Sequence, residues 1–126
     1  MNVKIDTKEK FHVITLNEPV LAANMTEELK QILTNCAQSS VKNIVLNLDK
    51  VDQVEPEIAT VLFNAQQKAY EENHSFVICG LRPTVEELLE KEEMLDLMNI
   101  TPTESEAWDI VQMEEIEREL FEDGSE

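Results

Sequence analysis

The residues best placed to do chemistry are two carboxylates, Glu55 and Glu57, which flank Pro56 at the start of a predicted helix. Paired carboxylates can divide acid and base roles in catalysis. The chain holds 27 acidic residues, however, so such a pair is expected from abundance alone. A carboxylate in a first helical turn also faces unpaired N–H groups, which contributes about 0.3–1 kcal/mol. We therefore expect a structural or binding role here, no catalytic residue, and a protein that is not an enzyme.

The other reactive or metal-binding side chains are isolated from one another. Cys36 falls on the apolar face of a predicted helix and Cys79 ends a predicted buried strand, so both are expected to be buried free thiols. Neither they nor His12 and His74 form the short spacings of a zinc site. No acidic run has the ligand pattern of a calcium loop, and two glycines are too few for a glycine-rich phosphate loop. We expect no metal and no cofactor.

The charge balance disfavours several classes of partner. Ten Lys and Arg oppose 27 Asp and Glu, giving a formal net charge of -17. Nucleic acid and anionic lipid are both bound through clusters of basic side chains, so neither is expected as a partner. No apolar run approaches the ~20 residues needed to span a bilayer, and the first residues lack the apolar segment of a secretory signal. We expect a soluble protein of the cytoplasm.

Hydrophobic periodicity predicts a small α/β fold. The predicted strands are 2–6, 10–16, 43–48 and 75–79, and the predicted helices are 24–38, 56–72, one from residue 82 and one from residue 103. Asn24 or Thr26 is expected to cap the first helix, and Thr103 with Glu106 the last. Residues 94–100 predict a turn of helix and a short strand. This order implies a mixed sheet of four or five strands with about four helices packed on it.

Several sequence stretches resemble, in their order and spacing, the STAS domain of bacterial anti-sigma-factor antagonists, over about residues 2–112. They are NIVLNLDKV at 43–51, FVICG at 76–80, PTVEELL at 83–89 and MLDLMNITPT at 94–103. The resemblance implies the STAS fold and a regulator that acts by protein–protein binding. In this family, a partner kinase that doubles as the anti-sigma factor phosphorylates a hydroxyl at the start of the second helix, and the unphosphorylated antagonist binds that kinase and frees sigma.

The phosphorylated motif of the family, D-S-S-G or D-S-T-G, corresponds here to residues 55–58, which places Glu57 at the acceptor position. Leu21 or a neighbour also replaces an aspartate common in the family. The resemblance therefore implies an antagonist-like protein without the phosphorylation switch. Glu57 either imitates a phosphate in part, with one charge against about -1.5 to -2, or only stabilises a helix start. Thr60 is a weaker candidate acceptor.

The family binds its partner at this end of the second helix. The resemblance thus implies a partner surface made of Glu55, Pro56, Glu57, Thr60, Phe63 and Asn64. The expected partner is an anti-sigma factor, a serine-kinase-like ATPase or another regulatory protein. Ala59, Phe63 and Tyr70 also form a partly apolar stripe, which either packs on the sheet or contacts the partner. Two alternative functions stay open: a subunit of a stress-sensing or transporter-ATPase assembly, and a sensor of a small ligand or nucleotide.

The C-terminal helix is strongly acidic, because residues 101–126 hold ten acids against Arg118 alone. This acidity either solubilises the protein or steers it toward a basic partner. Met113, Ile116 and Leu120 are rotated away from the apolar residues at 107–111, at 100° per residue. Either the helix bends or the second set contacts another chain, for instance in a homodimer. We divide the sequence into a STAS domain, 1–112, and an acidic extension, 113–126.

Overall fold

The computed structural model describes residues 1–124, with side chains to residue 121. The strands are β1 (Val3–Thr7), β2 (Phe11–Leu16), β3 (Val20–Leu21), β4 (Asn43–Asn47), β5 (Gln53–Val54), β6 (Phe76–Cys79) and β7 (Ile100–Thr101). The helices are α1 (Thr26–Ala37), α2 (Pro56–Glu71), α3 (Pro83–Lys91) and α4 (Glu104–Gly124), with single 3₁₀ turns η1 (Ala23–Met25) and η2 (Leu95–Leu97). The predicted α/β class, the mixed sheet and the number of helices are confirmed.

The main sheet has five strands in the order β1-β2-β4-β6-β7. β1 is antiparallel to β2, and the other pairs are parallel. Every residue of β4 is buried, as the continuous apolar run predicted. β3 and β5 form a separate two-stranded parallel sheet, in which Leu21 lies opposite Val54. This pair of strands was not predicted, because two residues are too few to show a periodicity.

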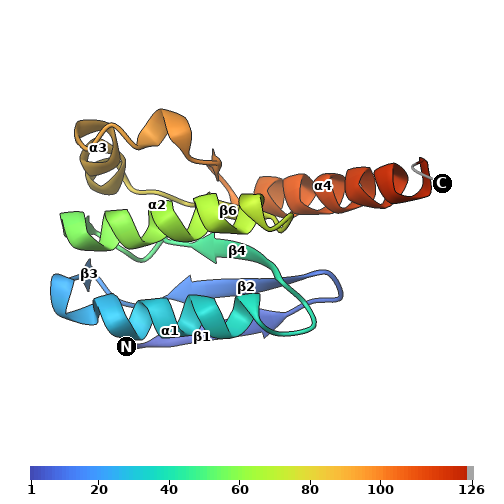
Figure 1. Cartoon of the computed structure of the whole chain (residues 1–126). Coiled ribbons are helices and arrows are strands. Elements are labelled where there is room, and N and C mark those ends of the chain that lie inside the picture. The colour runs from blue at the N-terminus through green and yellow to red at the C-terminus, as the bar shows by residue number, and fades with distance from the viewer. Residues whose placement is uncertain (125–126) are drawn as a thin grey trace.

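Alternate residues of the central strands enter two separate hydrophobic cores, because side chains along a strand point to opposite faces. Ile44 and Leu46 pack with α1, α2 and α3, whereas Val45 packs with Val77 of β6 and with Val111 of α4. α1 and α2 therefore cover one face of the sheet, and α4 covers the other (Figure 1).

Two details of the helices differ from the prediction. Met25 occupies the N-cap position of α1 and no side chain caps it, so the expectation of Asn24 or Thr26 is wrong. The Thr26 hydroxyl instead donates to the carbonyl of Ala23 at 2.7 Å, within η1.

On α2, Gln66 is fully buried although it is polar. Its side chain bonds to the backbone of Phe76 and Asn99, which joins α2 to β6 and to the segment before β7.

α4 begins with the predicted cap, because the Thr103 hydroxyl accepts a hydrogen bond from the backbone N–H of Glu106 at 3.3 Å. The helix continues without interruption to Gly124, and its C-terminal half projects beyond the end of the sheet (Figure 1). Arg118 holds this half to the body, since its Nη2 donates to Asn43 Oδ1 at 3.2 Å and to Ser75 Oγ at 2.9 Å. Tyr70 adds a second tie by donating to Glu114 at 2.9 Å.

Candidate functional site

The N-terminal end of α2 is held at the carboxyl ends of the parallel strands, where open α/β sheets usually bind ligands. The backbone N–H of Glu55 donates to the carbonyl of Leu21 at 2.9 Å, and those of Asp52 and Gln53 donate to Pro19 at 2.8 and 3.1 Å. The small β3–β5 sheet thus fixes the segment that leads into α2. The helix start is presented on a rigid support.

Glu55 is the N-cap residue of α2, with an extended backbone (φ -76°, ψ 152°). Its carbonyl accepts hydrogen bonds from Ile58 at 2.9 Å and Ala59 at 3.2 Å. Its carboxylate does not cap its own helix. Instead Oε1 accepts from the backbone N–H of Ala23 at 3.1 Å, in η1. Glu55 therefore links the starts of α1 and α2 and is exposed at the same time.

Glu57 lies in the first turn of α2, directly after Pro56 at the first helical position. Its side chain is exposed and forms no hydrogen bond or ion pair with the side chains that the structure describes. The helix dipole favours a negative charge at this end. The result is a fixed carboxylate that faces solvent and that no neighbour neutralises.

Thr60 and Asn64 are exposed and follow Glu57 at i+3 and i+7, so the three side chains form one strip along α2. Phe63 is half-buried beside the strip and packs on the core. The Thr60 hydroxyl donates to the carbonyl of Pro56 at 3.2 Å. The structure thus brings the six predicted surface residues together at one end of α2.

Of the two alternatives for the stripe of Ala59, Phe63 and Tyr70, packing inside the protein holds for Ala59, whose exposed fraction is 0%. Ala59 lies on the side of α2 that faces the core, next to Ile58, so it offers nothing to a partner. Tyr70 is half-buried, and its hydroxyl both accepts from Asn99 at 2.7 Å and donates to Glu114.

Sequence reasoning missed the contacts that place α3 beside this site. Arg82 Nη1 pairs with Asp52 Oδ1 at 2.6 Å, Arg82 Nε donates to the carbonyl of Asp49 at 2.8 Å, and the Thr84 hydroxyl donates to the carbonyl of Asp52. The partners lie about thirty residues apart in sequence, so no local pattern signals them. Gly80 permits the close approach: its φ is +75°, and a Cβ there would lie 3.0 Å from the Asp49 Cβ.

The two thiols are free and buried, as expected. Burial raises the pKa of Cys36 and raises that of Cys79 to about 12, so neither is an activated nucleophile. Among the residues that the structure describes, no three potential metal ligands come together. Within that same part of the chain, no helix has the length and apolar character required to cross a membrane.

Comparisons with known proteins agree with this geometry. A proposed anti-sigma factor antagonist from Thermotoga maritima has a similar structure, with a TM-score of 0.75 and 18% identity, over 87% of this chain and 94% of that one. SpoIIAA in its unphosphorylated form gives 0.71 and 18%, over 88% and 96%. RsbS from Moorella thermoacetica, in a variant with serine replaced by glutamate, gives 0.74 and 19%, over 89% and 96%.

At these identities the solved structures establish the fold alone. A search by sequence among curated proteins gave no match. The family model of the STAS domain, in contrast, matches residues 2–107, which is most of the sequence. On this match and on the shared fold, the chain belongs to the STAS domain family.

Proposed function

We propose that this protein is a non-enzymatic regulator that binds another protein through the start of α2, in the manner of an anti-sigma-factor antagonist, without a phosphorylation switch. The observation that carries the proposal is the unpaired, exposed carboxylate of Glu57 in the first turn of a helix held on a rigid support. Glu55, Thr60 and Asn64 surround it with polar groups, and Phe63 supplies an apolar edge.

The charge at this position is permanent. A phosphoserine carries about -1.5 to -2 charges and three acceptor oxygens at neutral pH, and it can be removed. The Glu57 side chain carries one negative charge and two acceptor oxygens. Its carboxylate is part of the residue and, unlike a phosphate, cannot be removed. Thr60 is a poor replacement acceptor because its hydroxyl is bonded to its own helix at 3.2 Å. The protein is therefore held in one binding state.

The partner expected from this surface is an anti-sigma factor or serine-kinase-like ATPase, or a regulatory protein derived from one. A glutamate substituted for serine is compatible with this fold in the RsbS variant, whose TM-score to this chain is 0.74. That supports a carboxylate being tolerated on this fold. The match to the family model ends at residue 107, so we assign residues 113–126 to an extension outside the partner-binding domain.

Photo-crosslinking from residue 60, one turn from an intact Glu57, tests the proposal. A photoreactive phenylalanine replaces Thr60 in one variant and Glu71 in a control. Glu71 is exposed at the other end of the same helix, about 17 Å away along its axis. We expect residue 60, and not residue 71, to capture a regulatory protein. Glu57→Lys should abolish binding of that protein, and Glu57→Asp should retain it. Equal capture from both positions contradicts the proposed surface.

The captured partner then tests the absence of the switch. Incubation with partner and ATP, followed by intact-mass measurement, should leave the wild-type chain unmodified. Glu57→Ser restores a hydroxyl at the acceptor position and should gain one phosphate if the partner retains kinase activity. A phosphate on the wild-type chain, at Thr60 or elsewhere, contradicts the permanent state.

A further inference from the structure

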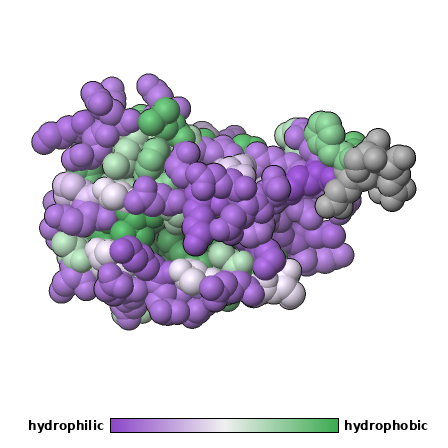
Figure 2. Space-filling view, viewed as in Figure 1, coloured by the Kyte–Doolittle hydropathy of each residue, from purple (hydrophilic) through white to green (hydrophobic). Residues whose placement is uncertain are grey.

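A groove of about 480 Å³ runs between α1 and α2, on the face of the sheet opposite α4. Its floor is Ile44 of β4 and Phe76 of β6, and its walls are apolar side chains of both helices: Leu33, Ala37, Val61, Ala65 and Ala69. Figure 2 shows hydrophobic surface between the hydrophilic side chains of these two helices. The groove is therefore an apolar channel with polar edges.

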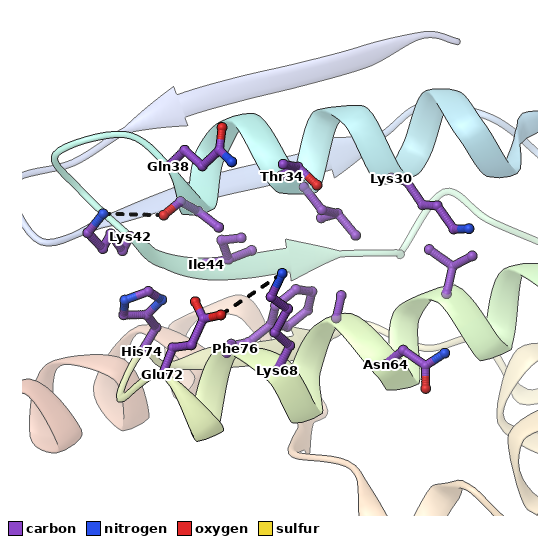
Figure 3. A pocket seen from close by; sticks show the side chains of 15 residues that line it. Lys30, Thr34, Gln38, Lys42, Ile44, Asn64, Lys68, Glu72, His74 and Phe76 are labelled. Carbon is purple, nitrogen blue, oxygen red and sulfur yellow. Dashed lines mark hydrogen bonds and ion pairs between the residues drawn. The ribbon is translucent and has the colours of Figure 1, made fainter.

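The edges of the groove are basic in a protein that is otherwise strongly acidic. Lys30, Lys42 and Lys68 line it, and Glu72 is its one acidic residue (Figure 3). Lys42 forms no ion pair with the described side chains and donates only to the carbonyl of Ala37 at 3.4 Å. Lys68 pairs with Glu72 at 4.0 Å, with the lysine side chain 75% exposed. Lys30 pairs with Glu27 at 3.7 Å, also on the surface. Exposed pairs of this kind are weak, so all three lysines can exchange their present contacts for a negatively charged occupant.

The C-terminal half of α4 presents the complementary surface. Met113, Ile116, Leu120 and Phe121 are 54–78% exposed, although each is a large apolar residue. Glu117 lies within this stripe, at i+4 from Met113, and forms no ion pair with the described side chains. We call these five residues the α4 stripe. It combines apolar anchors with negative charge on a helix that projects from the body (Figure 1).

We infer that the α4 stripe of one copy docks in the lysine-lined groove between α1 and α2 of a second copy. An amphipathic helix that places anchors at i, i+3, i+4 and i+7 in an apolar groove is a common mode of recognition. Glu117 would meet the lysines at the edge, and Ile116 and Leu120 would enter the channel. A chain cannot fill its own groove, because α4 packs on the opposite face of the sheet.

Charge favours this arrangement over direct pairing of two α4 stripes. Symmetric pairing would bring the Glu117 side chains of both copies to one apolar interface, where like charges are destabilising. Two chains of formal charge -17 also repel each other at long range, so stable contact requires local basic groups. Three lysines and one glutamate line the groove, and with Glu27, which pairs with Lys30 beside it, the local balance is still positive.

Sedimentation of the full chain over a range of concentrations tests the inference. The wild type should self-associate. A stripe variant, Ile116→Asp with Leu120→Asp, should associate at least about tenfold more weakly, because two apolar anchors are lost. A groove variant, Lys42→Glu with Lys68→Glu, should be weakened as much. Matched controls outside both surfaces are Leu97→Asp and Lys91→Glu, which are exposed and should associate like the wild type.

Mixing the two variants gives the decisive result. The groove variant retains an intact stripe and the stripe variant retains an intact groove, so an equimolar mixture should form a heterodimer at concentrations where each variant alone stays largely monomeric. All substituted residues are exposed, and circular dichroism of each variant checks that it is folded.

A wild type that stays monomeric at every concentration overturns the inference, as does a mixture that remains monomeric. A groove variant that associates like the wild type overturns it in favour of direct pairing of α4 stripes. Glu57 and Thr60 are not among the residues that line the groove, so these failures leave crosslinking from residue 60 unaffected.

Discussion

Replacing Gln66 with leucine should lower the free energy of unfolding by about 3 kcal/mol. Gln66 is 1% exposed, and its side chain makes three hydrogen bonds to the backbone. Nε2 donates to the carbonyl of Phe76 at 2.7 Å and to that of Asn99 at 3.1 Å, and Oε1 accepts from the N–H of Asn99 at 2.8 Å. Leucine fills a similar volume but makes none of these bonds.

The magnitude follows from the groups that leucine leaves without a partner. The carbonyl of Asn99 keeps a second donor, the N–H of Ile78 at 3.0 Å. The carbonyl of Phe76 and the N–H of Asn99 lose the bonds described above, and each buried unsatisfied group costs about 1–3 kcal/mol. Asn99 is only half-buried, so water compensates part of its loss. The sum is a large share of the roughly 5–15 kcal/mol that stabilises a typical domain.

Urea unfolding, followed by the fluorescence of the single tryptophan, measures the effect. The midpoint should fall while the slope m stays constant. The control is Gln67→Leu, the exposed neighbour on the same helix, which should change stability by less than about 0.5 kcal/mol. If Gln66→Leu is as stable as this control, the hydrogen bonds of Gln66 do not hold α2 to the segment before β7.

A glutamate at position 66 adds a pH-dependent check. Its carboxyl must be protonated to donate to the carbonyl of Phe76, and burial also favours the neutral form, so its folded pKa should lie above the unfolded value near 4.3. The native state then binds more protons than the unfolded state. The stability of Gln66→Glu should therefore fall as pH rises above about 4.3. A stability that increases with pH, relative to wild type, would contradict the assigned donor.

Three further predictions concern single residues. Tyr70 is the only tyrosine in the sequence. Burial raises its pKa to about 12, although the hydrogen bond from Asn99 acts in the opposite direction. The tyrosinate absorbance of the native protein should therefore appear near pH 12. Because the folded pKa is raised, the stability contributed by Tyr70 should be lost between about pH 10 and 12; a native midpoint near 10 would contradict this. Cys79, with its pKa raised to about 12 by burial, should resist alkylation until the protein unfolds, and rapid native labelling would disprove its burial. Gly80→Ala should lower the free energy of unfolding by about 1–2 kcal/mol because of the positive φ alone. The 3.0 Å approach of the new Cβ to the Cβ of Asp49 should add to this loss. Urea unfolding measures the effect, and an unchanged midpoint would show that this loop relaxes freely.

The parts of the fold that were predictable are those in which one segment carries its own signal. The apolar run at 43–48 showed a strand buried on both faces, and Pro56 and Thr103 marked helix starts. Glu57 was predictable as an exposed residue of a first helical turn for the same local reason. The helical period also predicts which side chains lie beside it, because Glu57, Thr60 and Asn64 fall on one strip along α2.

The parts that were not predictable depend on partners distant in sequence. Gln66 is polar, and its hydrogen-bond partners inside the protein are the backbone groups of Phe76 and Asn99, 10 and 33 positions away. The sequence left open whether Ala59 packs on the sheet or contacts a partner, because a small apolar residue fits either side of a helix, and the packing of α2 placed it inward. The lysine-lined groove combines side chains of two helices, of two strands and of the segments between them, so no single segment shows it.

α4 covers one face of the sheet, and this arrangement has a consequence for folding during protein synthesis. Within residues 1–124, Val45, Val77 and Phe11 are covered on their side of the sheet by α4, chiefly by Ala107 and Val111. Until the ribosome has released these late residues, the nascent chain exposes an apolar sheet surface of the kind that aggregates. The domain therefore cannot complete its folding until α4 has emerged from the ribosome, and the exposed apolar strands are most open to aggregation in the interval before that.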